Sequence, residues 1–83
     1  MSQQFRKKPV VIDAVQFTGE NIDDIRAFTG DPKLLFNKKE RQCFIRTSEG
    51  EMTANANDWI IKGVKGEFYP CKPDIFAATY ETA

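Results

Sequence analysis

The sequence predicts a small α+β domain, built from a strongly bent antiparallel sheet or a partly open β-barrel of about six to seven short strands with one short helix. Strand-like segments follow one another at intervals of about eight to twelve residues, which is typical of small β-rich folds. Only residues 21–30 combine helical spacing of apolar residues with a start signal and a stop signal. The 83 residues also match the length of a single domain with a small core, residues 1–83.

The longest predicted strand spans residues 5–17. Both of its faces are apolar, which predicts a strand that is covered on both sides. The two faces are formed by Val10, Ile12 and Ala14 and by Val11, Val15 and Phe17. Pro9 has no N–H group to donate, so pairing should begin after it. Asp13 is the one charged residue of this segment after Pro9, and we expect it at an edge or beside a lysine.

The predicted helix begins after Asn21, which is a favourable N-cap residue, and ends at Gly30, which can adopt the left-handed conformation of a C-cap. Ile22, Ile25 and Phe28 recur at helical spacing and should face the sheet. At little more than two turns, the helix depends on packing rather than on intrinsic propensity.

The remaining strands are predicted over residues 33–36, 42–47, 51–54, 58–62 and 67–71, followed by one turn of helix over 72–76 and an extended segment over 77–80. A hairpin is the simplest connection between the first two of these strands. Asn57 tolerates positive φ and marks the turn before the strand 58–62. We expect the last extended segment to pair with the first strand.

Composition argues against several classes of protein. Hydrophobic residues make up 41% and charged residues 29% of the chain, which is ordinary globular usage. The basic N-terminal residues are not followed by an apolar stretch, so we expect neither secretion nor membrane insertion. Twelve Lys and Arg balance twelve Asp and Glu, which argues against nucleic acid as a partner.

The charges alternate in blocks along the chain. The net charge is +3 over residues 5–8, −3 over 20–31, +4 over 33–46 and −3 over 49–58. Such alternation is typical of a solvated surface that mixes both signs. The alternative is a self-complementary surface, on which a positive patch of one copy meets a negative patch of another, and this favours a homo-oligomer.

The chemistry-bearing residues are few. The chain has no His, and two isolated cysteines do not supply the four ligands of a structural metal site, so we expect no metal and no cofactor. Cys43 and Cys71 are expected to be reduced and to pack. Activation of Cys71 by the neighbouring Lys72 is a lesser alternative. Without His the commonest general base is missing, and we assign no catalytic residue.

The strongest candidate binding site is the stretch 57–80, where aromatic residues and lysines are concentrated. Aromatic rings stack on planar ligands and ammonium groups neutralise phosphates, so the combination suits a nucleotide or another anionic small molecule. The predicted ligand-binding residues are Trp59, Lys62, Tyr69 and Lys72, together with Arg6 and Lys8 of the N-terminal arm. The alternative is that Trp59, Phe68 and Phe76 point into the core while the lysines point outward.

Two further functions stay open. Glu67 and Asp74 are carboxylates near the aromatic stretch, and they define the alternative of a small nucleotide-degrading hydrolase. A single-stranded nucleic-acid-binding module is the other alternative, against which the neutral net charge counts. Asp58 is interpreted as a side-chain acceptor in the turn after Asn57.

Residues 6–17, RKKPVVIDAVQF, and residues 58–76, DWIIKGVKGEFYPCKPDIF, resemble segments of small proteins that are common in tailed phages and prophages. These proteins share a turn of the Pro-Gly-Asp-Tyr-Gly or Pro-Gly-Asp-Trp type. Here Ala56-Asn57 stands where the family has Pro-Gly, and residues 20–50 match only in kind. The resemblance implies a phage or prophage origin and action in the host bacterial cytoplasm, with no established reaction.

Small phage accessory proteins of this kind often bind and disable a host component. From the aromatic and lysine cluster and the resemblance together, we predict a non-enzymatic binding protein, an accessory or anti-host-defence factor. It would bind a host protein or sequester an anionic small molecule such as a nucleotide signal.

Overall fold

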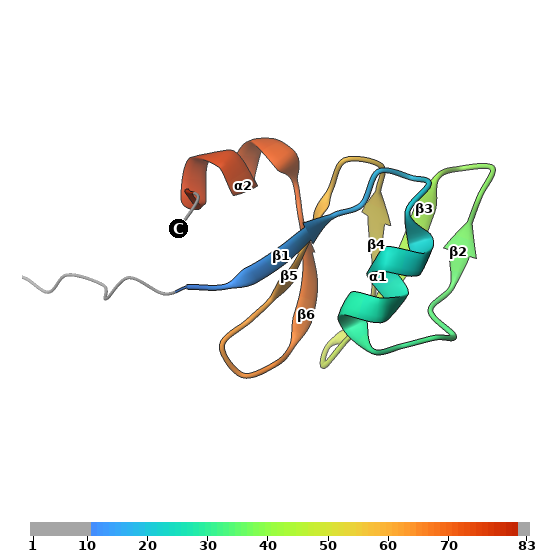
Figure 1. The fold of residues 1–83 in the computed structure, drawn as a ribbon, viewed down its shortest axis with the longest axis horizontal. Coiled ribbons are helices and arrows are strands. Elements are labelled where there is room, and N and C mark those ends of the chain that lie inside the picture. The colour runs from blue at the N-terminus through green and yellow to red at the C-terminus, as the bar shows by residue number, and fades with distance from the viewer. Residues whose placement is uncertain (1–10, 82–83) are drawn as a thin grey trace, which may run out of the picture.

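The computed structural model describes residues 11–81, which form two helices and six strands. The strands make two antiparallel sheets of three, ordered β1-β5-β6 and β2-β3-β4 (Figure 1). In chain order the elements are β1 (Asp13–Gln16), α1 (Ile22–Thr29), β2 (Phe36–Asn37), β3 (Gln42–Thr47), β4 (Gly50–Asn55), β5 (Trp59–Lys62), β6 (Phe68–Cys71) and α2 (Pro73–Thr79). The predicted α+β class is confirmed, but the described strands form two sheets rather than one and close no barrel.

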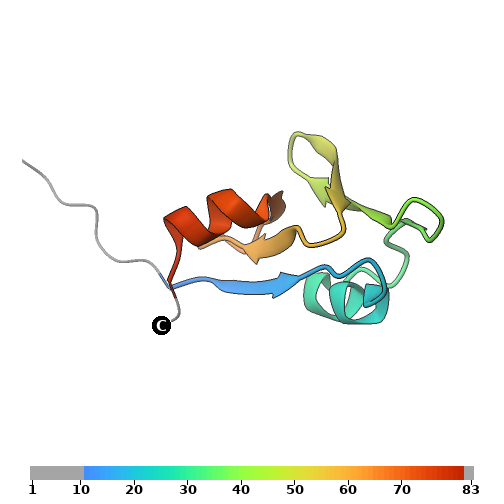
Figure 2. The same cartoon turned by 90° about the horizontal axis from the view of Figure 1, so that it is seen from above.

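The core lies between α1 and the two sheets, and the two helices lie at opposite ends of the molecule (Figure 2). Its fully buried members are Phe17, Ile25, Leu34, Cys43, Ile45, Ala54 and Ile60. Ile22 and Phe28 pack against them from α1, so the predicted sheet-facing side of this helix is confirmed. Neither helix in residues 11–81 is long and apolar enough to cross a membrane.

The ends of α1 follow the predicted signals with one difference. Gly30 has φ 69° and ends the helix in the left-handed conformation, as expected. Asn21 precedes the helix, but its side chain does not cap it. Instead Asn21 Oδ1 accepts a hydrogen bond from Thr18 N at 2.8 Å, and Asn21 Nδ2 donates to Gln16 O at 2.8 Å. Asn21 therefore fixes how the chain passes from β1 into α1.

The first strand is only partly as predicted. Residues 5–10 of the expected strand lie outside the described part of the chain, and β1 begins at Asp13. Val11 is 77% exposed, so the expectation that both faces are covered is wrong at this position. Asp13 lies opposite Lys62 in the ladder, as expected for a strand carboxylate beside a lysine.

Residues 72–80 differ from the prediction of one helical turn followed by an extended segment. The expected single turn over 72–76 extends to Thr79 as α2, and β1 pairs with β5 rather than with residues 77–80. Ala77 and Ala78 have high helix propensity. In addition, Phe76 and Tyr80 lie four residues apart, and their ring centroids are 5.1 Å apart. Both effects favour continuing the helix over an extended segment.

The turn between β4 and β5 joins the two sheets. Asn57 has φ 78°, which confirms the predicted positive φ. Its N–H donates to Phe17 O at 2.6 Å, and its carbonyl accepts from Gln16 Nε2 at 3.0 Å. The turn is thereby attached to the end of β1.

We expect Asn57→Ala to lower the free energy of unfolding by about 1 kcal/mol, because alanine is disfavoured at positive φ. Asn57→Gly should leave it unchanged within about 0.5 kcal/mol, because glycine adopts this conformation without strain. Urea denaturation followed by tryptophan fluorescence measures both changes. Equal stability of the two variants would contradict the turn conformation.

Candidate functional site

The predicted aromatic residues gather where α2 covers one face of the sheet β1-β5-β6. Trp59 pairs with Cys71 and Ile61 pairs with Tyr69, so these four side chains share a face. The ring of Phe76 on α2 stacks on Trp59 with centroids 4.3 Å apart and planes inclined by 6°. Alternation along the strands turns the neighbouring side chains, such as those of Ile60 and Phe68, to the other face and the core.

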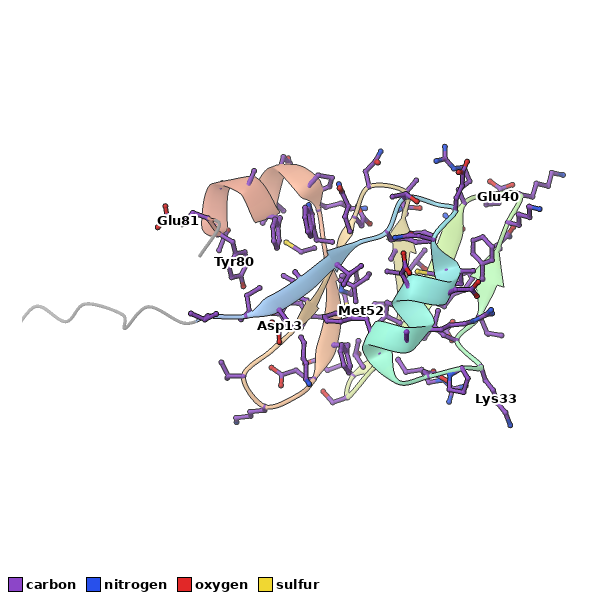
Figure 3. All side chains as sticks on the ribbon, viewed as in Figure 1. Asp13, Lys33, Glu40, Met52, Tyr80 and Glu81 are labelled. Carbon is purple, nitrogen blue, oxygen red and sulfur yellow. The ribbon has the colours of Figure 1, made fainter. Side chains whose placement is uncertain are left out.

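The aromatic cluster, defined as Trp59, Tyr69, Phe76 and Tyr80, is continuous and half-buried. Phe76 contacts both Trp59 and Tyr80. A hydrogen bond with Tyr80, assisted by burial, raises the pKa of Tyr69 to about 12. Figure 3 shows Tyr80 pointing from the end of α2 toward the sheet. The alternative that Trp59, Phe68 and Phe76 point into the core is confirmed for Phe68. Trp59 and Phe76 instead stack on each other on the opposite face of the sheet and stay half-buried.

Ile75 is a large apolar residue that is exposed next to this cluster. It precedes Phe76 on α2 and is 55% exposed. No residue of α2 is fully buried, so the helix rests on the sheet through Phe76 and leaves its outer side free of other described elements. Sequence reasoning missed Ile75. The sequence did contain a signal for it: in a short helix that packs on the sheet through Phe76, the adjacent residue Ile75 lies on a different side of the helix.

Lys72 is held by a buried carboxylate. Asp58 is only 3% exposed, and its Oδ2 accepts hydrogen bonds from Lys72 Nζ at 3.1 Å and from Asn55 N at 2.9 Å. The second contact confirms Asp58 as a turn acceptor. The first was not predicted, because nothing in the spacing of residues 58 and 72 pairs them. The ammonium group expected to neutralise an anionic ligand already neutralises Asp58.

The other predicted ligand-binding residues are not brought together. Lys62 lies three positions after Trp59 in β5, which places the two on opposite faces of the sheet. Arg6 and Lys8 lie outside the described residues. The structure therefore groups Trp59 and Tyr69 beneath α2, with Lys72 at the start of that helix.

Carboxylates surround the aromatic cluster. Asp74 lies in the first turn of α2, Glu81 follows Tyr80, and the charge of Glu67 acts on Tyr69. All three are exposed, and Figure 3 shows Glu81 pointing away from the sheet at the end of α2. Of the exposed lysines near these residues in the sequence, Lys72 is paired with Asp58, Lys62 lies on the other face of the sheet, and Lys65 lies in the turn before Glu67. Among residues 11–81, the surface around the cluster thus holds more free negative than positive charge.

Glu67 and Asp74 do not form a shared acid–base site. They flank opposite ends of β6, and the strand between them separates them by roughly 16 Å. The carboxylate of Glu67 lies against Gly63 of its own hairpin, where any side chain would collide with it. Among residues 11–81 there is also no group of three His, Cys, Asp or Glu side chains that could hold a metal ion.

Both cysteines are free, and their environments disfavour thiolates. Burial and the charge of Asp58 raise the pKa of Cys43 to about 11. Burial and the charges of Asp58 and Asp74 also raise the pKa of Cys71. The structure does not support activation of Cys71 by Lys72, because Lys72 pairs with Asp58 and the pKa of Cys71 is raised, first by burial and then by the charges of Asp58 and Asp74.

A small cavity of about 110 Å³ lies beside α1 and the sheet β2-β3-β4. It is lined by Thr29, Asp31, Leu34, Ile45, Arg46 and Phe68. Arg46 Nε and Asp31 Oδ2, 3.6 Å apart, form an ion pair there. Ligand pockets typically enclose about 300–1,000 Å³, so this cavity is too small for a nucleotide.

Comparisons of this chain with protein-family models, with curated proteins and with solved structures find no match. The site is therefore defined by its own geometry.

We expect Asp58→Ala to lower the free energy of unfolding by about 3 kcal/mol, because it removes the acceptor of two hydrogen bonds. Lys72→Met keeps the aliphatic stem but leaves the carboxylate unpaired. Because the Lys72 side chain is 54% exposed, we expect a smaller loss of about 1–2 kcal/mol. Chemical denaturation measures both losses. Lys62→Met, at an exposed lysine of β5, is the control and should change stability by less than about 0.5 kcal/mol.

Thiol labelling tests the cysteine environments. At about pH 8, iodoacetamide should modify Cys71 slowly and leave Cys43 unmodified in the folded protein, and it should modify both in denaturant. Intact-mass analysis of the wild type and of Cys71→Ser measures this. The folded state holds the Cys43 proton more tightly than the unfolded chain does, and this difference contributes to the stability of the fold. The contribution is complete below the ordinary thiol pKa of 9.0 and is lost as the pH rises to about 11. Labelling of Cys43 as fast as Cys71 would contradict the structure.

Proposed function

We propose that this chain is a non-enzymatic binding protein that docks on another protein through the α2 surface, defined as the aromatic cluster with Ile75. The observation that carries the proposal is the half-buried aromatic cluster beside an apolar residue that is 55% exposed. Tyr and Trp are enriched at the energetic centres of protein interfaces. Aromatic rings that already contact one another also lose little conformational freedom on binding.

The electrostatics of this surface favour a protein over a small anion. Lys72 is neutralised by Asp58 at 3.1 Å, and Glu67, Asp74 and Glu81 add negative charge around the rings. These carboxylates would repel an anionic ligand, and Lys72 is already paired with Asp58. A partner that presents Arg or Lys side chains would gain ion pairs at the rim and cation–π contacts with exposed ring faces.

The resemblance to small phage and prophage proteins supports the choice of partner. We propose that the partner is a host bacterial protein and that the chain acts in the host cytoplasm as an accessory or anti-defence factor. Such a role needs occupancy of a host surface and no turnover. This agrees with the separation of Glu67 from Asp74 along β6.

Ile75→Asp tests the docking surface. It places a carboxylate in the centre of the proposed contact at a position that does not support the fold, so binding should weaken at least about tenfold. Val64→Asp is the matched control, because Val64 is also exposed, at 72%, but lies in the turn between β5 and β6. Each protein is used to capture partners from bacterial lysate, and a captured protein is then purified and its affinity measured by calorimetry. Equal affinity of the wild type and Ile75→Asp would overturn the proposal.

The small-molecule alternative has its own test. Thermal-shift measurements with nucleotides and cyclic nucleotides should show no stabilisation at saturating ligand. A rise in melting temperature that is lost in Trp59→Ala or in Lys72→Met would instead support sequestration of an anion at this site.

A further inference from the structure

We propose that the outer face of the sheet β2-β3-β4 is a self-association surface, on which two copies of this chain pair about a two-fold axis that runs across the strands. The inner face of this sheet is defined by Cys43, Ile45 and Ala54, which are buried in the core. Alternation along the strands assigns their neighbours to the opposite face. Figures 1 and 2 show α1 on the inner side and no described element on the other.

The centre of the outer face is apolar. Phe44 and Thr53 are ladder partners there. Leu35 lies beside Phe44, since Leu35 O accepts the Phe44 N–H at 3.1 Å. Leu35 follows the buried Leu34 and precedes Phe36, which packs on the core, so it must point outward. At 57% exposed, Leu35 is the most exposed apolar residue among the described strands and connections of this sheet.

The two ends of the face carry opposite charge. The connection from β2 to β3 holds Lys38, Lys39, Glu40 and Arg41, a net charge of +2. The tip between β3 and β4 holds Glu49, with Glu51 next to it on β4. Because β3 runs the six residues between them, these groups are about 20 Å apart.

The remaining charges near the tip do not cancel this polarity. Arg46 is the ladder partner of Glu51, but its guanidinium pairs with Asp31 at 3.6 Å. Lys33 lies toward the same end of the sheet as the tip, where it lowers the negative charge of that end without reversing it. Figure 3 shows Lys33 and Glu40 at opposite ends. The basic connection and the acidic tip therefore form a charge dipole along the strands.

This dipole selects one symmetric arrangement. If the axis ran along the strands, the tip of one copy would meet the tip of the other, and like charges would repel. If the axis runs across the strands, β3 of one copy lies antiparallel to β3 of the other. Each acidic tip then faces the basic connection of the partner copy, twice by symmetry, with the two apolar centres in contact.

The size of the face predicts a weak dimer. Two strands of six residues and one of two, about 4.8 Å apart, present a flat area of about 220 Å². Stable interfaces bury about 800 Å² on each partner. Association should therefore depend on protein concentration and weaken when salt screens the charges.

Sedimentation velocity of the whole chain over a concentration series, at low and at high salt, tests the proposal. At low salt, Lys38→Glu/Lys39→Glu and Glu49→Lys/Glu51→Lys should each associate at least about tenfold more weakly than the wild type, because each makes both ends alike. An equimolar mixture of the two variants should recover dimers. Mixing gives an acidic copy opposite a basic one, so this recovery also shows that both variants are folded.

Substitutions at the centre complete the test. Leu35→Asp should abolish the dimer, and Val64→Asp, in the turn between β5 and β6, should leave it unchanged. A wild-type chain that is monomeric at every concentration would overturn the proposal. So would a dimer that persists in Leu35→Asp, or charge variants that do not recover on mixing. None of these outcomes bears on the α2 surface, which lies on the sheet β1-β5-β6.

Discussion

The ion pair between Asp58 and Lys72 connects the parts of the fold on which both proposed surfaces depend. Asp58 stands between β4 and β5, where its carboxylate accepts the N–H of Asn55 and its carbonyl oxygen accepts the N–H of Phe17. Lys72 leads directly into α2. A buried carboxylate without a cation destabilises the folded state. The position of Lys72, and with it the start of α2, is therefore fixed by a charge that has almost no contact with water.

The two proposed surfaces are compatible because they lie on different sheets. A dimer formed through the outer face of β2-β3-β4 leaves the α2 surface of each copy unoccupied. Such a dimer would present two α2 surfaces, and two linked weak contacts hold a partner more tightly than one when the partner is itself repeated. Weak self-association and partner binding would then reinforce each other.

Much of the local structure could be predicted because it follows from single residue types. Gly30 ends α1 and Asn57 adopts positive φ because of the backbone preferences of these residue types, which depend little on the surrounding structure. Ile25 faces the core because of its helical spacing. The division into two sheets could not be predicted, because nothing in the hydrophobic pattern of β4 and β5 indicates that the chain passes from one sheet to the other between them.

The candidate site was predicted less well, and the reason lies in the strand geometry. Trp59 and Lys62 are close in sequence, but a period of two puts them on opposite faces. Grouping them by sequence distance ignored this rule. Asp58 lies between β4 and β5, whereas Lys72 lies between β6 and α2. No local sequence pattern predicts a contact between residues so placed. The sequence shows the carboxylates near the aromatic cluster, but it does not show that Asp58 neutralises Lys72.

The packing of α2 has a consequence for its dynamics. Although Ile61 beneath it is fully buried, no residue of α2 itself is, and the helix has only seven residues. Elements with few buried apolar groups open at a lower free energy than the core they rest on. The backbone amides of α2 should thus exchange with solvent long before those of β3 and β5. A partner that binds only the closed form would slow that exchange without any change elsewhere in the domain.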